Sequence, residues 1–254
     1  MKALVVAQNT FREATRDRLL AGIVGAGAAL LAGTRLLSPL ALGEGRRLTV
    51  DLGLSGISFL GLLVVLLVGT SLVAKELERR TIYNLLSRPI ARPSYLLGKW
   101  IGLSATLWIF AAVLGLGLGI IIAVGGDAGF VGGIAQGTYL AALELTVMTA
   151  LAVLFSALST PILSALYTIG VYLVGQWSYD LRGFAAQLAP APRAALELAA
   201  SVVPNLPIFN VRAIAAAGHV AGADHLAVAT AYAALYVGCV LALAAAAFES
   251  RDFK

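Results

Sequence analysis

Few residues in this sequence have the type and spacing that catalysis or metal binding requires. His219 and His225 lie six positions apart beside Asp224, but a zinc site needs three or four ligands at suitable spacing. Serine, histidine and aspartate occur without the motif that surrounds a catalytic nucleophile. The single cysteine, Cys239, lies in an apolar run and cannot form a disulfide within the chain. The sequence therefore predicts neither an enzyme nor a metal site.

A phosphate-binding loop is also missing. The pattern Gly-x-x-x-x-Gly-Lys-Ser/Thr supplies the backbone N–H groups that cradle the phosphates of ATP. Only Gly98-Lys99 comes near it, and Trp100 stands where the hydroxyl residue is needed. We therefore expect no cofactor on this chain, and any ATP hydrolysis linked to it takes place on another chain.

Glu144 is the one acidic residue well inside a predicted membrane span. An ionisable side chain within a membrane is costly and often functional. Glu144 is thus a candidate for lining a substrate path or for taking a cation or a proton. The alternative is a structural pair with Arg35, or hydration from the outer surface.

The composition places these residues in a membrane protein. Of the 254 residues, 60% are apolar and 12% are charged, and the mean hydropathy is +0.91. A soluble domain has about 25% charged residues, so a soluble globule, a disordered chain and a fibrous repeat are excluded. We predict an all-α polytopic membrane domain over residues 1–254. The net charge of +5 comes from residues that flank apolar runs, which favours contact with anionic lipid and not with nucleic acid.

A transmembrane helix needs about 20 mostly apolar residues. Six stretches meet this need: residues 19–42, 52–74, 100–124, 138–158, 162–177 and 225–248. Lysine and arginine favour the cytoplasmic side; with a cytoplasmic N-terminus, twelve of them lie inside and six outside or near the outer ends. We therefore expect both termini to be cytoplasmic, in the inner membrane of a bacterium.

The largest external element is the connection over residues 178–224. Pro190 and Pro192 interrupt the apolar stretch 183–203, because proline breaks helical hydrogen bonding. A short external helix or a re-entrant segment over 194–203, a turn at 204–207 and a second short helix over 211–223 are predicted there.

The N-terminal stretch is too polar to span. Residues 1–18 are predicted to form a helix in the headgroup plane, with Phe11, Arg12 and Arg16 at the lipid surface. The alternative is that this stretch is only a positively charged flank of the first span, which fixes the orientation of the chain in the membrane.

The cytoplasmic segment 75–92 is the most informative part of the sequence. At about 100° per residue, its polar side chains gather on one helical face and its leucines on the other. Pro89 ends this helix, and Pro93 suits the first turn of the next. Aromatic, amide, hydroxyl and charged groups together suit a protein partner. The residues predicted to serve it are Glu76, Glu78, Arg79, Arg80, Thr81, Tyr83, Asn84, Ser87 and Arg88.

Glu78 falls near the middle of the apolar face of that helix. A carboxylate there needs a partner, which an N-terminal arginine or Lys75 would supply. The alternative is a side chain that reaches water from the helix edge.

These residues resemble the ABC-2 type transporter permeases. The resemblance rests on the acidic pair Glu76 and Glu78, on Thr81, and on the run that ends at Gly98-Lys99. That run contains Leu85-Leu86-Ser87-Arg88-Pro89 and Arg92, and the stretches Asn9-Thr10-Phe11-Arg12-Glu13 and Pro204-Asn205-Leu206 also look like the family. The chain is most similar to the permeases grouped with the nitrous-oxide-reductase maturation transporter. In the family, a small residue often lies between the acidic pair and the Thr, whereas this sequence has Arg79-Arg80 at that position.

The resemblance implies a permease half-transporter, working as an exporter. It implies a separate cytoplasmic ABC ATPase that holds ATP and Mg²⁺, and a second permease copy, either identical or paired. The helix over residues 76–87 would transmit the movement of the ATPase to the spans. Two alternatives stay open: a non-transporting membrane scaffold driven by an ATPase, and a secondary transporter, for which internal repeats and broken helices would be expected.

Overall fold

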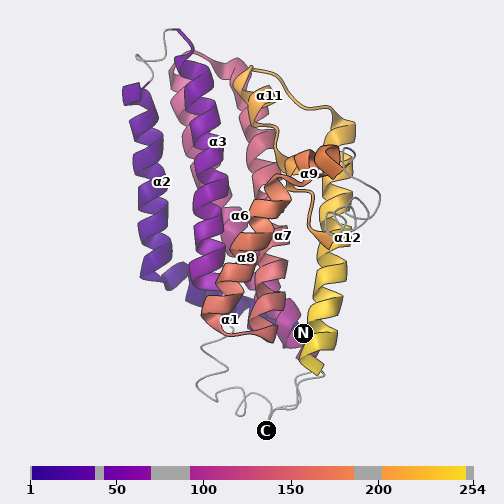
Figure 1. The fold of residues 1–254 in the computed structure, drawn as a ribbon. Helices are drawn as coiled ribbons and strands as arrows, with labels where there is room; N and C mark the ends of the chain where they lie inside the picture. The colour runs from indigo at the N-terminus through magenta and orange to yellow at the C-terminus, as the bar shows by residue number, and fades with distance from the viewer. Residues whose placement is uncertain (1, 38–42, 70–91, 186–201, 250–254) are drawn as a thin grey trace.

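The computed structural model describes residues 2–37, 43–69, 92–185 and 202–249. Every regular element in these ranges is a helix, so the all-α expectation is confirmed for the described part of the chain. Long helices run side by side, and α1 (Lys2–Arg16) lies across one end of the bundle (Figure 1). We call this the α1 end, and the opposite one the far end.

Five helices are long and apolar enough to cross a membrane. In lipid, a helix satisfies all of its backbone hydrogen bonds internally, which is why apolar runs of this length form one. They are α2 (Arg18–Leu37), α3 (Gly45–Val64) with the π-helical turn η2 (Val65–Gly69), α6 (Arg92–Val124), α7 (Val131–Leu158) and α12 (Ala223–Glu249). They correspond to five of the six expected spans.

The remaining expected span, residues 162–177, forms a shorter helix. It is α8 (Pro161–Gln176), with 16 residues. Such a helix is roughly 24 Å long, less than the ~30 Å of the hydrocarbon core. The helix is therefore confirmed, whereas six full-length spans are not.

The chain nevertheless returns to the end where it began. The last turns of α12 lie at the α1 end, and α8 leads from that end toward the far end (Figure 1). The helix α11 (Arg212–Ala216), in the connection that follows α8, lies at the far end, where α12 begins (Figure 1). The first and last described residues thus share one end of the bundle.

The described part of the external connection, residues 178–185 and 202–222, differs from the prediction in one helix. It contains α9 (Ser178–Ala185), the 3-10 turn η4 (Leu206–Phe209) and α11 (Arg212–Ala216). The predicted helix over 211–223 is too long, because Gly218 adopts φ +79 and stops it. The N–H groups of Gly218 and His219 donate to Ala215 and Ile214 at 3.0 and 3.1 Å, which completes a Schellman motif. Of the helix predicted over 194–203, only residues 202 and 203 are described.

Helix α1 packs closely against the beginning of α6. A Cβ on Gly98 would lie 2.7 Å from the Ala3 carbonyl oxygen, and one on Gly102 would lie 2.5 Å from that of Ala7. Only glycine permits such a close approach of two backbones. The start of α6 and helix α1 are thus joined through their main chains.

We expect Gly102→Ala to lower the thermal stability of the detergent-solubilised protein. The added methyl group meets backbone that cannot move aside, and overpacking of this kind costs about 1–3 kcal/mol. For a chain of this size that is a fall in Tm of roughly 2–10 °C, measured by tryptophan fluorescence. Gly22→Ala is the matched control, since a Cβ on Gly22 meets nothing within 4 Å. Equal changes in the two variants would contradict the backbone contact.

Candidate functional site

Glu144 lies in the middle of the bundle and is almost fully enclosed. Its exposed fraction is 4%. Its carboxylate accepts two hydrogen bonds: Ser58 Oγ donates to Oε2 at 3.1 Å, and Gln176 Nε2 donates to Oε1 at 2.6 Å. These donors come from α3 and α8, so three helices meet at one carboxylate. A buried charge is tolerated only with such partners.

Small residues bring these helices within hydrogen-bonding reach. Gly61 on α3 lies one turn from Ser58, and Leu145 of α7 packs directly against it. On the other side, Gly175 lies beneath Pro204 and Leu206 of the external connection, where a Cβ would be 2.9 Å from the Pro204 carbonyl oxygen. Helix α8 therefore ends with Gln176 held at the level of Glu144.

A cation approaches the carboxylate from the far end. Arg212, at the start of α11, donates from Nη1 to Ser55 Oγ at 2.8 Å and from Nε to Asn210 Oδ1 at 3.1 Å. Ser55 and Ser58 are one helical turn apart on α3, so they form a row between Arg212 and Glu144. The positive charge of Arg212 attracts the carboxylate, although the two groups form no direct ion pair. Together these residues form a polar network inside an apolar bundle.

The segment that carries Arg212 is fixed to the bundle. The Gln136 side chain accepts from the Ala221 N–H at 2.7 Å and donates to the Ala221 carbonyl at 3.2 Å. Asn205 donates from its backbone N–H to Tyr232 Oη at 2.8 Å and accepts from Ser178 Oγ at 3.0 Å. These bonds join the connection to α7 and α12, and the Ser178–Asn205 bond ties α9 to the later part of the connection.

The alternative pairing of Glu144 with Arg35 is wrong. Arg35 lies near the far end of α2 and donates to the backbone carbonyl of Ile121 on α6. The ion pairs of Arg46 with Asp127 and of Arg47 with Glu44 do not involve Arg35. The true partners of Glu144 were missed because they come from three other elements. The available signal for these partners in the sequence was the pair Ser55 and Ser58, two polar residues spaced three apart within an apolar span.

Two of the three residues predicted for the N-terminal helix lie on its exposed side. Arg12 and Arg16 are exposed and Phe11 is partly buried. The opposite face is packed: Thr10 is fully buried and Ala14 is 1% exposed. Helix α1 thus has one face on the bundle and one basic face free of it.

The residues predicted to serve a protein partner lie outside the described part of the chain, within 70–91. They are Glu76, Glu78, Arg79, Arg80, Thr81, Tyr83, Asn84, Ser87 and Arg88. The helix ends that flank this segment, Gly69 and Arg92, are described. Both ends lie near α1, because α6 contacts α1 at Gly98 and Gly102 and Leu103 packs against Gly69. In the described ranges, no group of three or more His, Cys, Asp or Glu side chains is placed to hold a metal ion.

The model of the family described as ABC-2 family transporter protein matches residues 4–253. No curated protein matches the chain.

A double-mutant cycle tests the contact between Glu144 and Gln176. We expect Glu144→Leu and Gln176→Leu each to reduce the free energy of unfolding, and the double variant to lose less than the sum. The expected coupling is roughly 0.6–2 kcal/mol, the range for polar pairs within membranes, measured by denaturant unfolding in micelles. The same cycle with Gln136→Leu in place of Gln176→Leu is the control, because Gln136 contacts Ala221 instead. Additive losses for the first pair would contradict the hydrogen bond.

Proposed function

The chain belongs to the ABC-2 family of transporter proteins, and from that premise we propose that it forms the membrane half of an exporter that a separate ATPase drives. It is a multi-pass membrane protein and a permease subunit of an ABC transporter. The ATPase would lie in the cytoplasm at the α1 end and hold ATP and Mg²⁺. A second permease copy would complete the transporter.

The observation that carries this proposal is the position of the helix ends around residues 70–91. Gly69 ends the second long span, Arg92 begins the third, and α1 packs onto α6 within about three turns of that start. A displacement applied to the segment between them would act on the spans on both sides and on α1. This arrangement supports a coupling role for residues 76–88 and a headgroup-plane position for α1.

Glu144 would belong to the substrate path, and α8 would control access to it. Helix α8 begins at Pro161, at the α1 end, and finishes at Gln176 on the carboxylate. A helix moves as a rigid body, so a displacement at Pro161 is carried about 24 Å to Gln176. In the present arrangement Ser58 and Gln176 occupy both carboxylate oxygens. Withdrawal of Gln176 would leave a charged acceptor open to a passing substrate.

The same geometry supports six crossings with both termini in the cytoplasm. Helix α8 and the residues after it bring the chain to the far end, and α12 returns it to the α1 end (Figure 1). The basic face of α1, with Arg12 and Arg16, would then meet the anionic cytoplasmic leaflet of a bacterial inner membrane.

Charge reversal tests the ATPase contact. We expect Arg79→Glu combined with Arg80→Glu to weaken binding of the co-expressed ATPase subunit by about tenfold, or 1.4 kcal/mol. Reversed charges at an interface repel the groups that they formerly attracted. The measurement is the amount of ATPase retained on the tagged full-length permease across a concentration series.

The matched control reverses the same number of charges at the far end, at Arg46 and Arg47, which are exposed. This variant should retain the ATPase at the original level. Undiminished binding in the first variant would refute a contact at these two arginines.

Thiol labelling tests the movement of α8. In a Cys239→Ala background, Ser58→Cys places a thiol at a site that is 5% exposed. We expect maleimide to label it slowly without nucleotide and several times faster while the complex in nanodiscs turns over ATP. Ser104→Cys, at a site that is 7% exposed on α6, should show no such change. A constant rate at Ser58→Cys would show that the carboxylate stays closed.

A further inference from the structure

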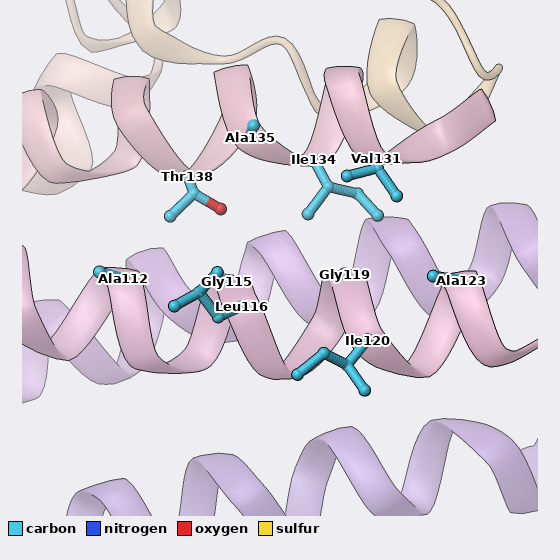
Figure 2. Close-up of a pocket in the computed structure, with 10 residues that line it drawn as sticks. All are labelled: Ala112, Gly115, Leu116, Gly119, Ile120, Ala123, Val131, Ile134, Ala135 and Thr138. Carbon is cyan, nitrogen blue, oxygen red and sulfur yellow. The ribbon is translucent and has the colours of Figure 1, made fainter. Parts of the chain in front are cut away.

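A groove lies between α6 and α7, in the half of the bundle nearer the far end. Its volume is about 490 Å³. Small residues of α6 line its base: Ala112, Gly115, Gly119 and Ala123. Figure 2 shows these positions opposite the first turns of α7, from which Ile134 and Thr138 reach toward α6.

Two glycines explain why the groove exists. At Gly115 the helices touch, because Thr138 packs directly against the glycine and would clash with a Cβ there. At Gly119, one turn farther along α6, a Cβ would meet no atom within 4 Å. The two helices are thus in contact at one level and separated at the next, and no side chain of the described residues fills the space between them.

The groove opens on a surface that faces away from the bundle. Leu116 and Ile120, on its α6 rim, are 68% and 62% exposed. No charged residue lines it. Both helices are long and apolar enough to cross a membrane, so this opening faces the hydrocarbon of the bilayer.

The dimensions of the groove indicate which kind of molecule can occupy it. Residues 112 to 123 span roughly 16 Å along a helix. A volume of about 490 Å³ over this length can hold a single unbranched hydrocarbon chain from end to end. A helix about 10 Å in diameter can only lie over the opening and place individual side chains in the groove.

We propose that the groove between α6 and α7 is a binding site for one acyl chain of a bilayer phospholipid. The small residues at its base let the chain lie below the outer surface of the helices, where it contacts protein on more than one side. Dispersion contacts of this kind are individually small and collectively large. The site requires only that these helices lie in a membrane, so it stands independently of ATPase coupling.

The test uses the full-length protein in nanodiscs that contain a phosphatidylglycerol with a diazirine on one acyl chain. After illumination, the labelled positions are mapped by mass spectrometry following pepsin digestion, since residues 100–181 contain no lysine or arginine. We expect labelling around Leu116 and Ile120 to exceed that at the exposed residues Leu235 and Leu243 of α12 by about fivefold, or roughly 1 kcal/mol. Equal labelling at both places would mean ordinary contact with bulk lipid and would overturn the proposal.

Gly119→Leu fills the groove without a backbone clash and should reduce its labelling to the level of α12. Gly238→Leu is the matched control, because Gly238 is exposed on α12 and its Cβ also meets nothing within 4 Å. The control should leave labelling of the groove unchanged. Persistent labelling of the groove in Gly119→Leu would overturn the proposal.

A cysteine test addresses a second copy of the chain as the occupant. In the Cys239→Ala background, Leu116→Cys should remain free of disulfide-linked dimer when membranes are oxidised. Efficient dimer formation through this position would assign the groove to a protein interface and overturn the lipid site.

Discussion

Burial of the Glu144 carboxylate within an apolar bundle constrains the arrangement of the helices around it. A charge in that environment is costly unless donors surround it. Ser58 and Gln176 supply these donors from two other helices, and Arg212 adds a positive charge through the row of serines. A shift of α3 or of α8 by one turn would remove one of the two donors, and a shift of α7 would remove the carboxylate from both. Three helices are thus linked through one carboxyl group.

Glycine determines where the helices approach one another most closely. Gly98 and Gly102 join α1 to the beginning of α6, and Gly61 lets α7 pack against α3 beside Ser58. Within lipid, helix association depends on such close packing, because hydrocarbon tails are as apolar as the helices themselves. The contacts near the α1 end and those around Glu144 belong to one continuous bundle. Movement at the proposed ATPase side therefore has a physical route to the carboxylate, chiefly through α8.

The fold was largely predictable from hydropathy, and the site was only partly so. Five spans and the N-terminal helix follow from runs of apolar and basic residues. Hydropathy located α8 to within one residue, but a helix of 16 residues is shorter than the ~30 Å hydrocarbon core that a full span must cross. It also extended α11 too far, because the left-handed conformation of Gly218 is a local backbone property that hydropathy ignores. Glu144 was identified, but the proposed partner Arg35 was wrong.

The sequence by itself determined that this chain is an α-helical membrane protein and that it belongs with the ABC-2 transporters. These properties reside in the apolar run lengths, the basic flanks and the motif of residues 76–99, all of which are local. Only the tertiary structure decided which polar groups meet. Residues 58, 144, 176 and 212 lie far apart in the chain, and no periodicity connects them. Their proximity arises from the way α3, α7, α8 and α11 pack, which depends on the shapes of many side chains at once.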